Sequence, residues 1–581
     1  MTEGARKARI RDASSELEVE LFVDVKGPIR NIDKGVWDGL LEPHDSPFLE
    51  YDWIHSMEES GCATEQKGWK PLHVLLVGAS TLSGKHDFSG KSGMRSWSAQ
   101  AGKSPVGAKS SQRSAQAGKS PVSSGGQVAD GGKVLAAVPL YLKAHSMGEF
   151  IFDHQWADAA YRAGIEYFPK LLIGVPFTPA SGARVLLQPD LTPAVKHRIR
   201  RAVGTFLKQI RRAVGTFLKQ PDSEPAVKHR IRRAVRIFRK QLADNSGISS
   251  VHVNFCSEEE VAAFAEAGYV HRKSLQYHWR NSHKGAEGDV KYHWRNSHKG
   301  AEGDVKYANF DEYLGAFASK RRIKIKRERK SVTDPERKSV TDPEIKRERK
   351  SFTVREEGGV TMRVVRGDDI SDDLLLRMFD IYKTTIVKNP YGRLYLNRDF
   401  FRRLGGDFRR HICLVIAERD GRLVGGTFNI VKAGRFYGRY WGTHAYIKNL
   451  HFETCYYKSI EYCIEQGLEV MEPGAGGGDF KFLRGFDPAV VHSAHACLNP
   501  MLHAAVAGFL RREREHIDES AEYLMHRSAV GKRQGSQNEY EVLSPVSDDI
   551  DESAEYLSAV GKRQGSQDPE AADFQGVAEE E

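Results

Sequence analysis

The sequence has no long apolar run. A membrane-spanning helix needs about 18 or more consecutive apolar residues, and no stretch of that kind occurs. The first residues, MTEGARKARIRDASSELEVELFVDV, also contain no apolar signal core. The early glutamates Glu16, Glu18 and Glu20 argue against an organellar transit peptide. We therefore expect a cytoplasmic protein without a membrane span, and the sequence leaves organellar import open.

Cysteine is scarce, because only six occur among 581 residues. No two of them form a C-x-x-C pair; they are Cys62, Cys256, Cys413, Cys455, Cys463 and Cys497. Their neighbours are apolar or lie in helical patterns, which is typical of buried free thiols in a reducing compartment. The cysteines therefore predict neither a metal site nor a disulfide framework.

Polar additions surround a chain that is apolar enough to fold. Hydrophobic residues make up 40% and aromatic residues 10%, whereas the mean hydropathy is −0.52. Two stretches hold few apolar residues, namely the Ser/Gly/Lys-rich segment 79–132 and the acidic tail 517–581. Segments of this composition cannot bury enough apolar surface to fold. We expect a disordered insertion and a disordered tail.

Several peptides occur twice in nearly or fully identical form. They are SAQAGKSPV at Ser98 and Ser114, RRAVGTFLKQ at Arg200 and Arg211, YHWRNSHKGAEGDVK at Tyr277 and Tyr292, ERKSVTDPE at Glu328 and Glu336, IDESAEYL at Ile517 and Ile550, and SAVGKRQGSQ at Ser528 and Ser558. Solenoid repeats share one period and diverge in sequence, but these copies do neither. Recent duplication or an error in the predicted coding sequence explains them better, and we expect one copy of each to fit into the fold.

Strand and helix patterns alternate in both halves of the chain. Leu72–Val77 and Val134–Leu142 read as two strands of a hairpin, and so do Ile412–Ala417 and Leu423–Val431 around the Asp-Gly turn at 420–421. Helical spacing follows over Phe310–Lys330 and again after Asn499. The order predicts an α/β fold with mixed sheets.

The stretch from Phe452 to Pro488 combines a helix, a short strand and a glycine-rich turn. Tyr456, Ile460, Cys463 and Ile464 recur at helical spacing, and a strand is expected to end at Glu472. The next residues are ligand-binding candidates: Gly474, Gly477, Lys481 and Arg484. A carboxylate, a flexible turn and a lysine in this order suit polarisation of a carbonyl or phosphate. They equally suit a surface turn with solvated charges.

The same stretch carries a family resemblance. The pattern G-x-x-x-K-x-x-x-G-F-x-P, formed by Gly477, Lys481, Gly485, Phe486 and Pro488, resembles the signature of the FemAB-like acyltransferases. That family is associated with peptidoglycan biosynthesis or recognition and is similar in fold to the Gcn5-related N-acyltransferases. Further stretches that resemble it begin at Gly148, Val251 and His492.

The resemblance implies two tandem acyltransferase-like lobes with mixed sheets. With the composition, it divides the chain into an N-terminal extension (1–45), a first lobe (46–307) that holds the 79–132 insertion, a basic helical connector (308–352), a second lobe (353–516) and the tail. It also implies transfer of an acyl or aminoacyl group to an amine acceptor. The alternative is a non-catalytic glycan- or nucleotide-binding protein that keeps the fold. Oligomeric state stays open.

Lys481 and Glu472 are the catalytic candidates. Lys481 stands where the family pattern places its lysine, and a fixed cation can stabilise the oxyanion of acyl transfer. Glu472, at a strand end, is the candidate general base if desolvation raises its pKa; the alternative is a structural pair with Lys481. No Q/R-x-x-G-x-G/A motif is found, which makes acyl-CoA doubtful and favours an aminoacyl-tRNA-like donor as co-substrate. No other cofactor is expected.

Three further stretches hold binding candidates. FDHQWAD contains Asp153, His154 and Trp156, which suit either acceptor recognition or an N-cap with aromatic packing. RYWGTH contains Tyr440, Trp441 and His444, which suit either a cleft wall or sheet packing. The basic run contains Lys320, Arg321 and Lys324, which suit either a phosphate-bearing partner such as tRNA or a solvated helix face.

A histidine pair occurs in HSAH. We expect His492 and His495 on one face of a strand, with structural packing favoured over a metal pair because no third ligand stands at metal spacing.

Overall fold

The computed structural model describes residues 7–8, 21–78, 133–216, 247–284, 304–333, 359–388, 393–475 and 478–529. The predicted insertion at 79–132 lies outside these residues, as do most of the second copy of the Tyr277 peptide, most of the acidic tail and Gly477. The elements described below therefore belong to these ranges.

A large mixed sheet dominates the structure. It has 11 strands in the order β13-β14-β15-β16-β17-β10-β18-β9-β7-β6-β3. Their bounds are β3 Trp69–Pro71, β6 Leu140–Lys143, β7 Lys170–Ile173, β9 Ser250–Cys256, β10 Val270–Arg280, β13 Thr361–Arg366, β14 Ile412–Arg419, β15 Arg422–Lys432, β16 Arg435–Thr443, β17 Val470–Glu472 and β18 Asp487–Cys497. The mixed α/β prediction is confirmed.

The two halves of the chain build the two ends of this sheet in the same way. In each half, antiparallel strands lead to one parallel pair: β7 with β9 in the first half and β16 with β17 in the second. Two long strands lie between these pairs and are exchanged. β18 of the second half pairs with β9, and β10 of the first half pairs with β17. This arrangement is two lobes joined by shared strands.

A second, smaller sheet is formed by strands from the first half of the chain. It has 5 strands in the order β1-β2-β4-β5-β8. Their bounds are β1 Lys7–Ala8, β2 Leu21–Gly27, β4 His73–Gly78, β5 Lys133–Val138 and β8 Leu186–Leu187. The predicted hairpin is present as β4 paired with β5, but the predicted second strand is divided at Pro139, where the chain passes from β5 to β6 of the large sheet. A short ribbon, β11 His283–Lys284 with β12 Asp304–Val305, completes the described strands.

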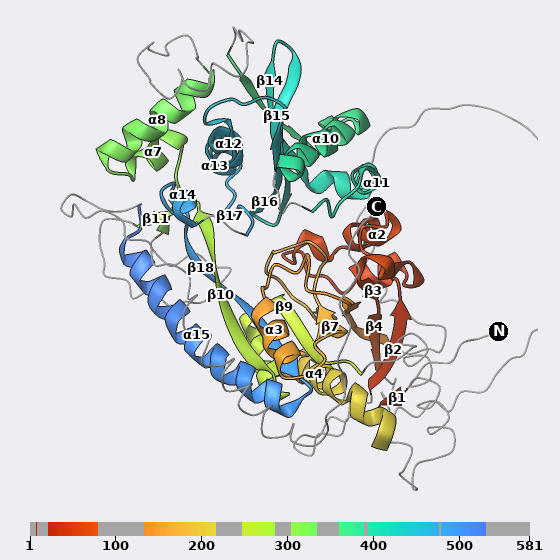
Figure 1. The fold of residues 1–581 in the computed structure, drawn as a ribbon. Helices are drawn as coiled ribbons and strands as arrows, with labels where there is room; N and C mark the ends of the chain where they lie inside the picture. The colour runs from red at the N-terminus through yellow and green to blue at the C-terminus, as the bar shows by residue number, and fades with distance from the viewer. Residues whose placement is uncertain are drawn as a thin grey trace, which may run out of the picture.

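Helices pack on both faces of the sheets (Figure 1). Their bounds are α1 Lys34–Asp38, α2 Tyr51–Glu59, α3 His154–Arg162, α4 Pro193–Thr216, α6 Glu258–Glu266, α7 Phe310–Gly315, α8 Ser319–Thr333, α10 Asp372–Lys388, α11 Arg398–Arg403, α12 Leu450–Phe452, α13 Lys458–Glu465, α14 Gly478–Phe482 and α15 Pro500–His526. Figure 1 shows α15 running along the exchanged strands β10 and β18, which it contacts. On the second lobe, α10 and α12–α13 lie on opposite sides of β14–β16.

Local sequence signals set several of these elements. Ser257 and Glu260 form a reciprocal capping box at the start of α6. Asp420 and Gly421, with φ of 50° and 72°, make the tight hairpin turn between β14 and β15. Two expectations are wrong. The single helix expected over 310–330 is two helices, α7 and α8, and α15 continues to His526 rather than ending at His516.

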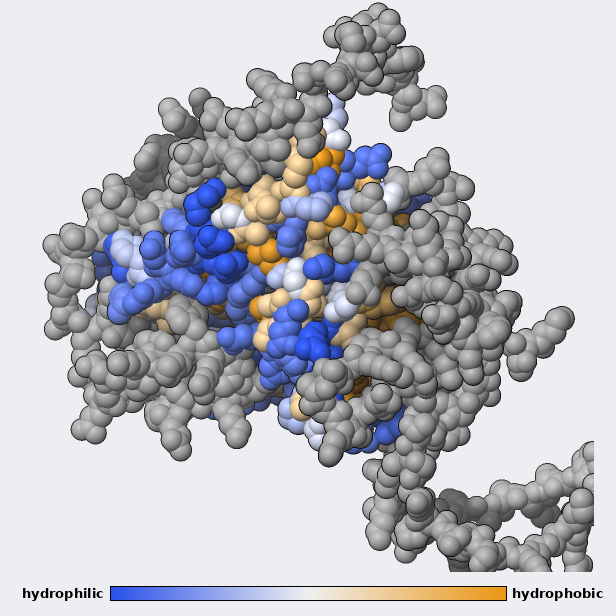
Figure 2. Space-filling model, turned by 90° about the horizontal axis from the view of Figure 1, so that it is seen from below, coloured by the Kyte–Doolittle hydropathy of each residue, from blue (hydrophilic) through white to orange (hydrophobic). Residues whose placement is uncertain are grey.

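The cores are apolar and the thiols are buried. Five of the six cysteines are buried and Cys455 is half-buried, and all six are free. Within the described ranges, no helix is long and apolar enough to cross a membrane. Seen from below, most of the described surface is hydrophilic, with smaller apolar areas between (Figure 2).

Candidate functional site

The hydrogen-bonded pairing of the parallel strands β16 and β17 ends where the predicted turn begins. They pair only from Arg435 to Tyr437 and from Val470 to Glu472. Beyond that point a Cβ on Gly438 would lie 3.2 Å from the Cα atom of Pro473, so the two backbones still approach closely. Gly474 has a φ of 90°, which favours glycine. The chain then enters α14, which carries Lys481.

Lys481 is a buried cation at this turn. Its Nζ atom donates a hydrogen bond to the carbonyl oxygen of Gly474 at 2.6 Å, and the residue is only 3% exposed. None of the ion pairs among the described residues includes it. Burial lowers its pKa to about 8, although interaction with Cys455 opposes that change. An ammonium group without a carboxylate partner can interact with a developing negative charge.

Glu472 does not have the predicted surroundings. Its Oε1 atom accepts hydrogen bonds from Arg435, at 3.1 Å from Nε and from one terminal nitrogen as well. Burial alone raises the pKa of Glu472, but the charges of Arg435 and His278 and the Arg435 hydrogen bond lower it overall. The expectation of a raised pKa is therefore wrong, and so is the alternative of a pair with Lys481.

An aromatic wall surrounds His451, and the charge of Lys481 acts on this histidine. The ring of His451 lies 5.2 Å from Trp441, 5.5 Å from Tyr456 and 6.1 Å from Phe480, measured between centroids. These rings come from β16, from α12 with the turn that follows it, and from α14. That turn, Glu453–Tyr457, has π-helical geometry, which is frequent at functional sites. The sequence analysis did not select His451; the aromatic cluster HFETCYY at the helix start was the available signal.

Arg484 belongs to the framework behind this wall. Each of its three side-chain nitrogens donates a hydrogen bond, to the hydroxyl of Tyr457, the carbonyl of Phe480 and the carboxylate of Glu328. Its guanidinium also lies 3.6 Å from the ring centroid of Phe452. Because these groups already occupy its donors, the geometry does not support the prediction that Arg484 binds substrate.

The three candidates in RYWGTH, namely Tyr440, Trp441 and His444, lie in different surroundings. Trp441 contacts His451 and therefore belongs to the wall. Tyr440 packs on the other side against Tyr382 and Phe428, as alternation along a strand requires. His444 is exposed just beyond β16. Of these three candidates, Trp441 alone is part of the aromatic wall.

The three candidates in FDHQWAD, namely Asp153, His154 and Trp156, lie apart from the Lys481 turn. Asp153 is buried and accepts hydrogen bonds from Lys170 and from Tyr167 at 2.6 Å, so it caps no backbone group of α3. Trp156 packs 5.0 Å from the ring of His495, and His154 is exposed. None of the hydrogen bonds or ring contacts described for these three residues reaches Lys481. Their predicted role in acceptor recognition stays untested.

The two histidines of HSAH do not share one face of β18. The Nδ1 atom of His492 lies 3.0 Å from Nε2 of His271, whereas Nε2 of His495 lies 2.8 Å from the hydroxyl of Ser493. Residues three apart in a strand point to opposite sides, so the expectation was wrong. In the part of the chain that the structure describes, no group of three or more possible metal ligands occurs.

The basic run forms α8, which is anchored next to the site. Its buried side holds Glu328, bound to Arg484, and Arg329, bound to Glu453 and Glu461. On its outer side Lys320 and Lys324 are exposed and Arg321 is half-buried. Among the described residues, none of these three cations has an ion-pair partner. The helix therefore presents unneutralised positive charge close to the wall.

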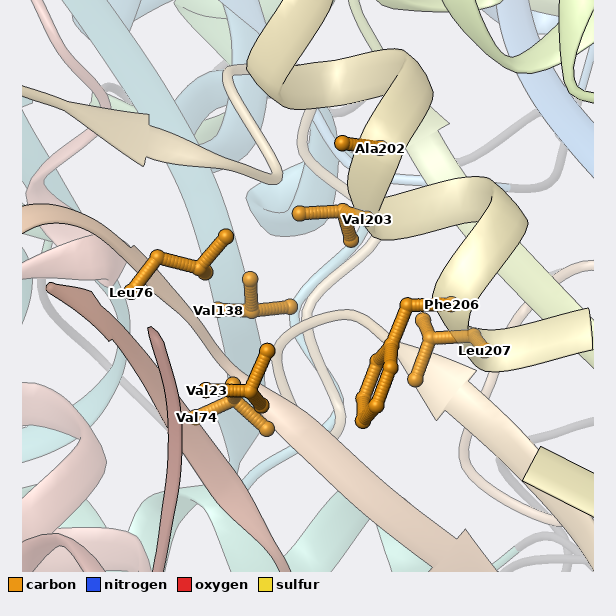
Figure 3. A pocket seen from close by; sticks show the side chains of 8 residues that line it. All are labelled: Val23, Val74, Leu76, Val138, Ala202, Val203, Phe206 and Leu207. Atoms are coloured by element: carbon orange, nitrogen blue, oxygen red, sulfur yellow. The ribbon is translucent and has the colours of Figure 1, made fainter. Parts of the chain in front are cut away.

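A small apolar hollow lies elsewhere, between the N-terminal sheet and α4 (Figure 3). Carbon side chains line it: Val23, Val74, Leu76, Val138, Ala202, Val203, Phe206 and Leu207. None of these side chains can carry a proton or bind an anion. The hollow therefore does not compete with the Lys481 turn as a reaction site.

Comparison with solved structures finds matches of low similarity. "The structure of L-PGS from Bacillus licheniformis" has 10% identity, covers 51% of this chain and 80% of that chain, and has a TM-score of 0.27. FemX has 10% identity, covers 66% and 89%, and has a TM-score of 0.30. A GCN5-related N-acetyltransferase from Sphaerobacter thermophilus has 10% identity, covers 64% and 80%, and has a TM-score of 0.23. These values support no argument about function.

The sequence profile of one family matches most of the chain, whereas a comparison with curated proteins finds no match. The FemAB-like profile, described as peptidoglycan biosynthesis/recognition, matches residues 28–92, 109–222, 216–341 and 336–531. Each break between these segments falls in or beside one of the duplicated peptides. The matched segments contain the Lys481 turn, the aromatic wall and both lobes. The chain thus belongs to the FemAB-like family.

Proposed function

We propose that the chain is an N-acyltransferase that moves an aminoacyl or acyl group from an activated donor to an amine. The family description, peptidoglycan biosynthesis/recognition, supports an amine on a precursor peptide as the acceptor. The observation that carries the proposal is Lys481, a buried ammonium group that binds only the carbonyl of Gly474 among the described residues.

The chemistry of acyl transfer explains why such a cation is useful. When an amine attacks an ester or thioester carbonyl, the carbonyl oxygen becomes an oxyanion. A fixed positive charge in a poorly hydrated site stabilises that oxygen more than it stabilises the neutral carbonyl. The Gly474 carbonyl holds the ammonium in place before substrate binds.

The basic face of α8 supports a donor with several phosphates. Lys320, Arg321 and Lys324 carry charge that no described carboxylate neutralises, and phosphate backbones attract such faces through counterion release. Glu328 and Arg329 attach the same helix to α14 and to the π-helical turn. A long polyanion bound on α8 would thus place its end near Lys481, which favours aminoacyl-tRNA over acyl-CoA.

The test compares binding with turnover. Purified protein is screened by thermal shift against coenzyme A, uncharged tRNA and UDP-N-acetylglucosamine. Single-turnover transfer is then measured from tRNA charged with radiolabelled alanine, and from acetyl-CoA, to a lysine-containing peptide of the peptidoglycan type. Lys481→Ala should lower the transfer rate by about 10²-fold or more, with a much smaller change in the donor Kd.

The binding-protein alternative gives the opposite pattern. It predicts no transfer from any donor, together with a loss of affinity in Lys481→Ala that reflects a contact to the bound ligand. Equal losses in rate and affinity would contradict the oxyanion role of Lys481. Thermal unfolding of the variant, measured without ligand, separates these results from loss of the fold.

A further inference from the structure

The proposed reaction needs a proton acceptor that the sequence analysis did not identify. An amine that attacks a carbonyl must lose a proton before the new amide is stable. Glu472 is engaged by Arg435, and Lys481 must keep its proton to act as a cation. The acceptor therefore has to be another group at the same turn.

His451 has the position that such a group requires. It lies in α12, two residues before the π-helical turn, and its half-buried ring is surrounded by Trp441, Phe452, Tyr456 and Phe480. Among the described residues, no hydrogen bond is formed to either nitrogen of this ring. A partly exposed imidazole without a partner can accept a proton from a ligand.

The charges around His451 keep it neutral in the free protein. Lys481 of α14 and Arg484 just beyond it are the cations that act on it, and Cys455 and Tyr456 of the π-helical turn are its other titratable neighbours, both with raised pKa values. From β16 it meets the uncharged Trp441. Burial, followed by the charges of Arg484 and Lys481, lowers the pKa of His451 to about 4. A neutral imidazole is the form that can take a proton.

We infer that His451 is the general base of the transfer, an inference that rests on the proposed function. The nitrogen lone pair of the amine forms the C–N bond, the carbonyl π pair moves to the oxygen beside Lys481, and an imidazole nitrogen of His451 takes the N–H proton. On collapse the C=O bond re-forms and the bond to the leaving oxygen or sulfur breaks. That atom receives the proton from the imidazolium, which restores neutral His451.

The low basicity of His451 in the free protein changes during the reaction. The oxyanion that forms beside Lys481 offsets one of the two cations that disfavour imidazolium. Negative charge nearby raises the pKa of a histidine, so proton uptake becomes more favourable as the C–N bond forms. The arrangement couples attack on the carbonyl to deprotonation of the amine.

The experiment uses the full chain, tRNA charged with radiolabelled alanine and a lysine-containing peptide. His451→Ala should lower the single-turnover rate by about 10²–10⁴-fold, with donor affinity nearly unchanged, and added imidazole should restore part of the rate. His451→Phe keeps the aromatic packing, should be equally slow and should not respond to imidazole because no cavity is left. His526→Ala, at an exposed position of α15, serves as the control.

The outcomes separate this inference from the proposed function. Wild-type transfer together with a fast His451→Phe variant overturns the role of His451 and leaves the proposed function intact. A folded His451→Ala protein whose rate does not rise with imidazole also overturns it. Failure of the wild type to transfer from any donor refutes the proposed function, and the assignment of His451 falls with it.

Discussion

The Nζ atom of Lys481 lies 2.6 Å from the carbonyl oxygen of Gly474. This contact joins the last turn of α14 to the segment that follows β17. The carbonyl fixes the ammonium group in direction but does not neutralise it. Lys481 therefore keeps a positive charge that no carboxylate among the described residues neutralises, and the following predictions depend on this state.

The transfer rate should fall as the pH rises through the pKa of Lys481. Burial lowers this pKa to about 8, and the protonated form is the one that stabilises an oxyanion. Activity should therefore be present below about pH 8 and decline above it. Lys481→Arg should be slower at every pH, because a planar guanidinium replaces a compact ammonium poorly. The decline of the transfer rate near pH 8 should disappear in Lys481→Arg, since arginine stays charged. A decline that persists in Lys481→Arg would assign it to another group.

Glu472→Gln should reduce stability more than it reduces chemistry. Removing one partner of a buried ion pair typically costs about 3–5 kcal/mol, because the other charge stays buried without compensation. Urea unfolding measures this loss, and the double variant Glu472→Gln with Arg435→Met should recover part of it. A stable, folded Glu472→Gln protein without transfer activity would instead support the catalytic role that the geometry opposes.

The pH dependence of stability follows from the same pair. The pKa of Glu472 is below its usual value of 4.5 in the folded chain. The pair therefore stabilises the fold fully above about pH 4.5, and this stabilisation is lost as the pH falls through the lower folded pKa. Unfolding free energies measured across this range should show a smaller loss in acid for Glu472→Gln than for the wild type.

Local patterns predicted the elements of the site but not their partners. Helix, strand and glycine turn follow from spacing within Phe452–Pro488, and the resemblance located Lys481. The partner of Glu472 is Arg435, which is 37 residues away on the neighbouring parallel strand. Nothing in periodicity indicates which of two parallel strands brings its arginine opposite a given carboxylate. The sequence did not indicate His451 for the same reason, because the surroundings of its ring are formed by three elements that meet only in the fold.

The exchange of β10 and β18 between the lobes also could not be predicted from the sequence. Each strand has a pattern that would suit a place in its own lobe, and pairing partners depend on the whole sheet. The shared strands mean that each lobe completes its sheet with a strand from the other half. The lobe limits at 307 and 352 stay predictions.

Charge reversal on α8 should weaken binding of a phosphorylated donor. If Lys320, Arg321 and Lys324 each contact a phosphate, changing all three to glutamate should lower tRNA affinity and reduce the slope of log Kd against log salt by about three. The control reverses three exposed cations away from α8: Lys67, Lys383 and Arg393. Fluorescence anisotropy with labelled tRNA measures both. Equal slopes in the two triple variants would show that the α8 charges are only solvated.

Gly442→Ala should separate β16 from α10 and disturb the wall of the site. A Cβ atom on Gly442 would lie 1.8 Å from the carbonyl oxygen of Ile381 in α10, far closer than atoms can approach. The helix is also tied to this strand by the hydroxyl of Thr385, which donates to the carbonyl of Trp441 at 2.6 Å. Moving α10 therefore displaces Trp441, the residue that packs on His451.

The expected loss of stability for Gly442→Ala is about 3 kcal/mol or more, at or above the upper end for overpacking. Gly508→Ala is the matched control, because a Cβ at that helical position meets nothing within 4 Å. Removing a glycine from a helix interior stabilises by about 0.5–1 kcal/mol, so the two alanines should change the unfolding free energy in opposite directions. Urea unfolding measures both variants. A Gly442→Ala protein as stable as the wild type would show that β16 and α10 do not pack as closely as the structure has them, and the position of Trp441 beside His451 would then lose its support.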